Sequence, residues 1–323
     1  MFSATPLKKI PLTAVDLEDH PFSVPPFSDL TPLSASIQEV GLLAPPWLRS
    51  RAGKRWQVVT GLKRLLAVAQ LGWEQVPART LPAATPDFHC LLVSLYDNAF
   101  SRGFNLLEQA VLAARLLAHL EGPKVAASFL PCLGLPPSHA LLEKLLSLTT
   151  LEAPLQQLAA QSRLGLTAAA RLAAWAPRDR EAVLPFLNGL PLSQSKQEEF
   201  LEGLELLARR EGLTPKEILS RADLQQYLAD TALTPQERAE SVRRLLKGWL
   251  SPRLVAAQEA FQNALGRLGL RQHPRLRLQP PPAFEGPDFH LEVRFRDAEE
   301  LKRLLKELTR LVQEEEFSHL TQF

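Results

Sequence analysis

The spacing of hydrophobic residues divides the chain into three stretches of different character. In the first, residues 1–104, short apolar runs alternate with segments in which apolar residues recur at helical spacing. One helix is expected to begin at Thr31, as its N-cap, with Pro32 in the first helical position, and a second to begin at Gly61. The expected strands are 56–59, 76–81 and 90–95. These elements predict a small mixed α+β domain.

Residues 105–268 follow a different pattern, rich in leucine and alanine with a period of about 3.6 residues. The pattern recurs without a fixed-length repeat, and prolines mark the joints between its segments. We therefore predict an all-helical middle region. Its clearest helical segments are 106–120, 141–148, 155–160, 167–175, 198–209 and 238–250.

Period-two alternation returns in residues 269–323. It covers 275–279 and 290–296, which predicts two strands, and Asp297 is placed to cap a helix over 298–315. A strand–strand–helix unit of this size buries little surface alone, so its open sheet face is expected to pair with a second copy. The predicted fold class is thus α+β throughout, and the predicted assembly is a homodimer.

The composition is that of a globular protein, with 46% hydrophobic and 22% charged residues and a net charge of +2. This charge neither requires nor excludes a nucleic-acid partner, because such binding depends on a local basic patch. Cys90 and Cys132 form no metal-binding spacing, which indicates a reducing cytoplasm, and Cys90 is expected to be buried. No apolar stretch of about 20 residues occurs, so no membrane span is expected.

The turn at Gly61 is the first candidate for chemistry. A strand ends just before it and a helix begins just after it, and the backbone N–H groups of a helix N-terminus attract anions. Lys63 and Arg64 place two cations in this first turn, where they oppose the helix dipole unless an anion is bound. The pattern favours a phosphate site. The alternative is that both side chains simply extend into solvent.

The segment from Asp97 to Arg102 is the second candidate for chemistry. Asp97 and Asn98 offer hard oxygen ligands suited to Mg²⁺, and Arg102 is placed to pair with a phosphate. Asn105 is a candidate nucleotide contact and also fits an N-cap, with Glu108 completing a capping box. The two roles of Asn105 are compatible.

Candidate DNA contacts occur at two places. Residues 124–131, 134–137 and 138–148 have the order of a helix-turn-helix, in which Ser138, His139 and Lys144 would face DNA. This second helix is poor in side chains that read base edges, so plain helical packing is the alternative. A basic group further along comprises Arg243, Arg244 and Lys247, flanked by Arg238 and Arg253, for which a solvated helix face is the alternative.

Several segments, in order, resemble the N-terminal domain of the ParB family. Residues 36–46 (SIQEVGLLAPP) resemble its S-I-x-x-x-G-L-x-x-P segment, and 56–65 (WQVVTGLKRL) its y-x-v-v-x-G-x-R-R motif. Residues 97–102 (DNAFSR) stand where the family has E-N-x-x-R, and 105–110 (NLLEQA) resemble N-P-x-E-x-A. Sulfiredoxins share this fold, but their chemistry needs a cysteine in the turn that reads Gly61-Leu62-Lys63-Arg64 here.

The resemblance implies a pocket for CTP with Mg²⁺. Its nucleotide contacts would be Gly61, Lys63, Arg64, Asn98, Arg102 and Asn105, and its metal ligands Asp97 and Asn98. Two positions depart from the family pattern: Asp97 replaces a glutamate, and Arg102 lies one position later than the family arginine, which leaves Ser101 at that site.

The resemblance further implies a cytoplasmic, nucleoid-associated protein that binds DNA, dimerises and acts in chromosome or plasmid partition, with a partition ATPase as partner. Two other functions fit the same residues. One is a nucleotide-dependent phosphotransferase or nuclease, since a Mg²⁺–phosphate pocket can support phosphoryl transfer. The other is an adaptor that keeps the fold and the dimer but has lost both ligands.

Overall fold

The computed structural model describes residues 7–23, 29–99 and 103–320. The chain groups into two compact units, residues 1–201 and 202–323. The first combines a mixed sheet with helices, and the second is helical with a small hairpin. The predicted α+β class is confirmed. The division predicted at 104/105 and 268/269 stays a prediction.

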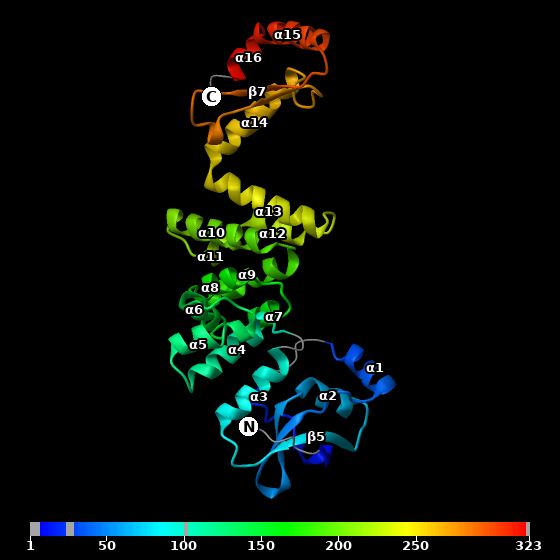
Figure 1. The fold of residues 1–323 in the computed structure, drawn as a ribbon. Coiled ribbons are helices and arrows are strands. Elements are labelled where there is room, and N and C mark those ends of the chain that lie inside the picture. Colours follow the sequence, from blue (N-terminus) through cyan, green and yellow to red (C-terminus); the bar gives the residue numbers. More distant parts are fainter. Residues whose placement is uncertain (1–6, 24–28, 100–102, 321–323) are drawn as a thin grey trace. The chain divides into compact units, whose positions relative to one another are not determined.

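A five-stranded sheet forms the framework of the first unit (Figure 1). Its strands are β1 (Lys8–Pro11), β2 (Val15–Asp16), β3 (Trp47–Ser50), β4 (Trp56–Thr60) and β5 (Gln75–Leu81). They are ordered β1-β5-β3-β4-β2, with β3 antiparallel to β4 but parallel to β5. The expected strands over 56–59 and 76–81 are confirmed as β4 and β5.

Three helices pack with this sheet: α1 (Thr31–Val40), α2 (Leu62–Gln70) and α3 (Asp87–Ala99). The α1 and α2 helices lie against each other and share a core with the strands, whereas α3 lies against β4. Leu48, Val58, Leu65 and Val76 are fully buried in that core. Burial of each such side chain contributes about 1.5–3 kcal/mol to stability.

The expected strand over 90–95 is wrong, because these residues lie within α3. Cys90, Leu91, Ser94 and Leu95 are the buried positions, and this spacing is that of one helix face. A short apolar run does not by itself distinguish a buried strand from a buried helix. As a consequence, Asp97 and Asn98 lie in the last turn of a helix. Cys90 is buried as expected, and this burial raises the pKa of its thiol.

The start of α1 differs from the prediction by one residue. Leu30, not Thr31, holds the N-cap position, and Thr31 is the first helical residue. Asp29 supplies the capping oxygen, since its Oδ1 accepts from the backbone N–H of Thr31 at 2.9 Å and from its hydroxyl at 2.6 Å. These donors hold the pKa of the Asp29 carboxyl below its usual value.

Helices continue through the rest of the first unit, as predicted. They are α4 (Leu106–Leu117), α5 (Gly122–Ser128), α6 (His139–Leu148), α7 (Ala153–Ala160), α8 (Leu166–Ala173) and α9 (Pro177–Gly189). The α10 helix (Gln194–Glu211) spans the boundary between the units. The expected capping box is confirmed: Asn105 Oδ1 accepts from the Glu108 N–H at 2.9 Å, and Glu108 Oε2 accepts from the Asn105 N–H at 3.0 Å.

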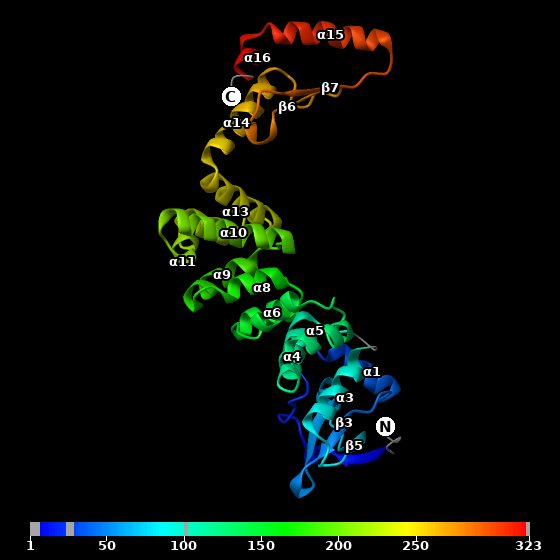
Figure 2. The ribbon, with the colours of Figure 1, turned by 60° about the vertical axis from the view of Figure 1, so that its left-hand side comes forward.

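The second unit contains the predicted strand–strand–helix module (Figure 2). Its elements are α11 (Pro215–Leu219), α12 (Ala222–Ala229), α13 (Pro235–Leu250), α14 (Pro252–Arg267), β6 (Leu276–Gln279), β7 (His290–Val293), α15 (Ala298–Val312) and α16 (Glu315–Leu320). Asp297 caps α15 as expected, accepting from the Glu300 N–H at 2.7 Å. Phe261 of α14 shares a core with Leu276, Leu304 and Leu308, so the module also needs α14.

Single 3₁₀ turns complete the secondary structure, at Leu12–Ala14, Ala52–Lys54, Pro131–Leu133 and Pro282–Phe284. Within residues 7–23, 29–99 and 103–320, no helix has both the length and the hydrophobicity that a membrane span requires.

Candidate functional site

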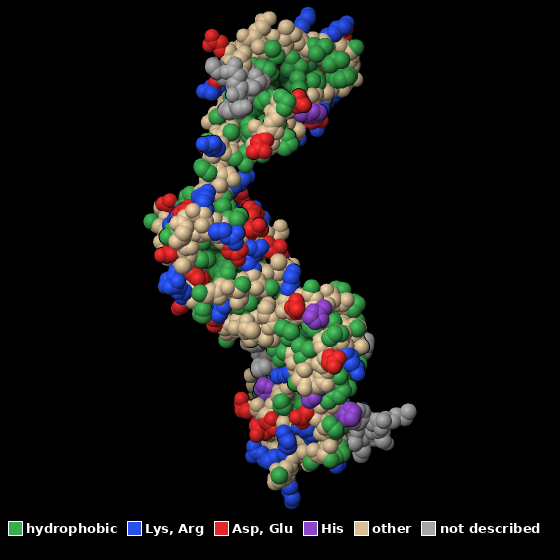
Figure 3. Space-filling view, turned by 90° about the vertical axis from the view of Figure 1, so that its left-hand side faces the viewer, with side chains coloured by type: hydrophobic (Ala, Val, Ile, Leu, Met, Phe, Trp, Pro, Cys, Tyr) green, Lys and Arg blue, Asp and Glu red, His purple; other side chains and the backbone are tan. Residues whose placement is uncertain are grey.

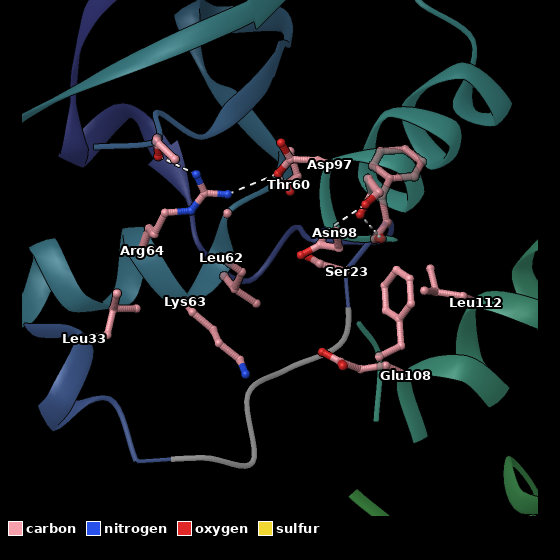
Figure 4. A pocket seen from close by; sticks show the side chains of 15 residues that line it. Ser23, Leu33, Thr60, Leu62, Lys63, Arg64, Asp97, Asn98, Glu108 and Leu112 are labelled. Atoms are coloured by element: carbon pink, nitrogen blue, oxygen red, sulfur yellow. Dashed lines mark hydrogen bonds and ion pairs between the residues drawn. The ribbon is translucent and has the colours of Figure 1, made fainter. Parts of the chain in front are cut away.

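A cavity of about 380 Å³ opens in the first unit beside the N-terminus of α2 (Figure 4). This volume is within the range of small-molecule sites, and its lining joins an apolar part to a charged part. The lining residues are Phe22, Ser23, Leu33, Ala44, Thr60, Gly61, Leu62, Lys63, Arg64, Ser94, Asp97, Asn98, Phe104, Glu108 and Leu112.

Gly61 makes the sharp turn from β4 into α2. Its φ of +90° lies in the left-handed region, which side chains with a Cβ rarely adopt. A Cβ at this position would also meet Pro46 Cβ at 2.8 Å and Arg64 Nη2 at 3.3 Å. The turn therefore requires glycine, and it places the N-terminus of α2 at the cavity, which Leu62 and Lys63 line (Figure 4).

Arg64 is held in place by residues outside its own helix. Its Nη2 lies 3.1 Å from Asp97 Oδ2, and its Nη1 donates to the Ala44 carbonyl. Thr60 donates its hydroxyl to the same Asp97 oxygen at 2.8 Å. The end of β4, the start of α2 and the end of α3 thus meet at one point. The alternative that Arg64 extends into solvent is wrong, because its side chain is only 20% exposed.

Asp97 and Asn98 present carboxylate and amide groups to the cavity from the end of α3. Asn98 donates its Nδ2 to the Ser94 carbonyl at 2.8 Å, a bond that orients its amide. Among the described residues, no group of three or more His, Cys, Asp or Glu side chains could hold a metal ion. These two oxygen donors do fit a Mg²⁺ ion whose other ligands are phosphate oxygens and water.

The opposite wall comes from the start of α4. Phe104, Glu108 and Leu112 line it, and the carboxyl-bearing Glu108 is buried. Asn105 is not among the lining residues, and its side chain caps α4. Arg102, which the resemblance placed among the phosphate contacts, lies outside the described residues.

The structure therefore brings together Gly61, Lys63, Arg64, Asp97 and Asn98 of the predicted site. Sequence reasoning missed the remaining lining residues. Thr60 could have been found, because it directly precedes the glycine turn and β4 ends there. The apolar lining residues Phe22, Leu33 and Leu112 come from distant segments and carry no local signal.

The segment predicted as a helix-turn-helix contains two helices, α5 and α6. The first ends at Ser128, before the predicted 131, and the 3₁₀ turn Pro131–Leu133 precedes the predicted turn at 134–137. Ser138 is the N-cap of α6 and its hydroxyl accepts from the Leu141 N–H at 3.3 Å, so that oxygen already has a structural role. His139 and Lys144 are exposed, and His139 Nδ1 lies 3.5 Å from a Glu143 carboxylate oxygen.

The second basic group lies on α13 in the second unit. Arg244 and Lys247 are exposed, whereas Arg243 is half-buried and pairs with Glu240 at 2.9 Å. Arg238 donates to the Leu228 carbonyl at 3.1 Å. Two of the predicted contacts, Arg244 and Lys247, are thus available at the surface.

Comparisons with known proteins converge on one family. The family model of the ParB N-terminal domain matches residues 4–98. A probable plasmid-partitioning protein ParB of Thermus thermophilus is 34% identical over 99 residues, which are 31% of this chain and 32% of that protein. A nucleoid occlusion protein of Halalkalibacterium halodurans is 32% identical over 85 residues, 26% of this chain and 29% of that protein. The chain therefore spans about a third of the length of these curated relatives.

Two solved structures of the C-terminally truncated chromosome-partitioning protein ParB from Caulobacter crescentus are also similar. The complex with the centromeric parS site has a TM-score of 0.34 and 20% identity, and covers 60% of this chain and 98% of that one. The complex with CTP-gamma-S has a TM-score of 0.26 and 22% identity, and covers 56% and 98%. Because both scores are low, the fold assignment depends on the family match and on the sheet described above.

Proposed function

We propose that the chain, whose residues 4–98 match the family model of the ParB N-terminal domain, is a ParB-like, DNA-associated protein of chromosome or plasmid partition or organisation. The observation that carries the proposal is the meeting of the Gly61 turn, Arg64 and Asp97 at one cavity. The proposal places the protein at the nucleoid in the cytoplasm and includes a partition ATPase as partner.

The proposed ligand is CTP with Mg²⁺. Its phosphates would lie at the N-terminus of α2, where the backbone N–H groups, Lys63 and Arg64 neutralise their charge. Asp97 and Asn98 would hold Mg²⁺, which when bound screens the charge between phosphates. Phe22 and Leu33 supply the apolar surface that a base and sugar require. Arg102 and Asn105 remain proposed contacts from the family pattern.

The proposed DNA contacts are His139 and Lys144 on α6, with Ser138 at its N-cap, and Arg243, Arg244 and Lys247 on α13. Few of these side chains can read base edges, so most of the binding energy would come from phosphates. We expect DNA affinity in the presence of CTP and Mg²⁺ to fall steeply with salt, with a log–log slope of about −0.9 per phosphate contact. Fluorescence anisotropy of a labelled duplex measures this, and absence of DNA binding at low salt would contradict the proposal.

Hydrolysis of CTP, or another phosphoryl transfer, is the second proposal. The feature in its favour is the Asp97 carboxylate, which faces the cavity beside Lys63 and Arg64. Phosphate release measured in the same mixtures separates binding with turnover from binding alone. An adaptor without either ligand would show neither nucleotide binding nor DNA binding.

The proposed homodimer uses the C-terminal module. Figure 3 shows hydrophobic side chains gathered on these elements, at the top of the view. The exposed apolar residues there include Phe295 at 50%, Leu305 at 51% and Val312 at 52%. Leu305 and Val312 are seven positions apart on α15 and so share one helix face, separate from the buried Leu304 and Leu308.

We expect Leu305→Glu to weaken this dimer about thirtyfold or more, because it places a charge in the apolar centre of the interface. Analytical ultracentrifugation over a concentration series measures the dissociation constant. Lys306→Glu changes a neighbouring exposed residue and serves as the matched control. A wild-type chain that stays monomeric at all concentrations would contradict the dimer.

A further inference from the structure

A buried arginine lies on β3, the central strand of the sheet. Arg49 on β3 is only 3% exposed. Its Nε and Nη2 donate to Gln57 Oε1 at 2.9 and 2.5 Å, and its Nη1 donates to the Thr85 carbonyl at 2.8 Å and to Asp87 Oδ1 at 2.6 Å. A guanidinium this deeply buried is strongly destabilising unless it is paired. The four bonds to Gln57, Thr85 and Asp87 supply this pairing.

This network extends to one wall of the cavity. Gln57 donates its Nε2 to both carboxylate oxygens of Asp19, at 2.7 and 2.8 Å, and the guanidinium of Arg49 lies 5.2 Å from the centre of the Phe22 ring. From the other side, Ser94 of α3 donates its hydroxyl to the Phe22 carbonyl at 2.9 Å. The segment from Asp19 to Phe22 is thus held at three points. Gln57 holds the Asp19 carboxylate, Arg49 contacts the Phe22 ring, and Ser94 holds the Phe22 carbonyl.

The fixed segment leads directly into two residues that line the cavity, Phe22 and Ser23. The Ser23 hydroxyl oxygen is buried, yet it has no hydrogen-bond partner among the described residues. A buried hydroxyl left unsatisfied costs about 1–3 kcal/mol. A polar ligand in the cavity would satisfy it, and this is a separate indication that the wall is built to meet a ligand.

We propose that Arg49 is a positioning residue of the nucleotide pocket: through the Gln57–Asp19 bonds and its contact with the Phe22 ring, it sets where the Phe22–Ser23 wall meets the ligand. The proposal rests on the proposed nucleotide-binding function. Arg49 does not line the cavity and so acts only through its neighbours. This positioning role gives a reason for a buried charged network on β3, because hydrogen-bonded polar side chains hold a neighbouring segment in one geometry.

A double-mutant cycle tests whether Arg49 affects nucleotide binding through Phe22. Arg49→Met is expected to weaken CTP binding about tenfold in the otherwise wild-type chain, but only about threefold or less in the Phe22→Ala background. In that background the contact with the Phe22 ring is gone, and only the Gln57–Asp19 bonds still couple Arg49 to the wall. Arg55→Met is the matched control: it removes an exposed arginine that pairs with Asp16 at 3.5 Å and has no contact with Asp19, and it should leave the affinity unchanged. An equal loss in both backgrounds would overturn the proposal.

Hydrogen exchange of the ligand-free chain gives a readout that does not depend on nucleotide. In Arg49→Met, amides of residues 15–23 should exchange about tenfold faster while those of α2 keep their wild-type rates. Uniform acceleration, or no change at 15–23, would show a merely structural role and overturn the proposal. If Arg49→Met does not fold, Asp19→Ala replaces it in both measurements, because it removes the acceptor of both Gln57 bonds and does not line the cavity. A wild-type chain without nucleotide affinity would defeat the proposed function, while the exchange result would still decide whether Arg49 positions the wall.

Discussion

Gly61→Ala is expected to lower the free energy of unfolding of the N-terminal domain by about 2–5 kcal/mol and to abolish nucleotide binding. The left-handed backbone at φ +90° contributes about 1–2 kcal/mol of this loss. The new Cβ would meet Pro46 Cβ at 2.8 Å, and overpacking of this kind costs about 1–3 kcal/mol more. Relief of the clash must move the start of α2, and Arg64 moves with it. Chemical denaturation and calorimetric titration measure the two effects.

Gly72→Ala separates the backbone strain from the Cβ clash as causes of the loss at Gly61. Gly72 also has a left-handed backbone, with φ +72°, but a Cβ there meets nothing within 4 Å. It should lose only the backbone part, about 1–2 kcal/mol, and keep the nucleotide affinity of the wild type. Equal losses of stability and affinity in the two variants would contradict the contact between Gly61 and Pro46 as the cause.

Arg64→Ala is expected to reduce CTP affinity about a hundredfold or more. Two charge-assisted hydrogen bonds to a phosphate are worth about 1.5–3 kcal/mol each, and their loss already accounts for this factor. The variant also removes the cation that lies 3.1 Å from Asp97 and helps to fix its carboxylate. Calorimetric titration with CTP and Mg²⁺ measures the loss, and an affinity within about twofold of the wild type would contradict a phosphate contact at Arg64.

Arg55→Ala is the matched control for Arg64. Arg55 is an arginine of the same domain, more than half exposed and 3.5 Å from Asp16, away from the cavity lining. Its removal changes the domain's charge equally and should leave CTP affinity within about twofold of the wild type. A comparable loss in both variants would mean that long-range charge, and not contact at the α2 turn, controls binding.

The part of the site that could be predicted is the part that local sequence encodes. A strand, a glycine and two cations in succession predict an anion site at a helix N-terminus, and Gly61, Lys63 and Arg64 line the cavity. The pairing of Arg64 with Asp97 could not be predicted, because it depends on α3 passing the end of β4. The apolar run from Cys90 to Leu95 fits strand and helix alike, so its burial on one helix face became visible only in the structure.

In the fold, too, the features that local sequence encodes could be predicted and those that depend on tertiary contacts could not. The helical middle and the strand–strand–helix module are predicted by periodicity over long segments, which is a strong signal. Core membership is a tertiary property: Phe261 belongs by sequence to the helical stretch, but it packs with Leu276 and Leu304 of the C-terminal module. The network of Arg49, Gln57 and Asp19 was missed for the same reason, since no local pattern marks a buried arginine.

The most direct test of the account is a calorimetric titration of the whole chain with CTP and Mg²⁺, with ATP and GTP as controls. We predict saturable CTP binding at about one nucleotide per chain, lost in Arg64→Ala and kept in Arg55→Ala. If no nucleotide binds, the cavity at the α2 turn is not a nucleotide site, and the pairing of Arg64 with Asp97 is only a structural bond.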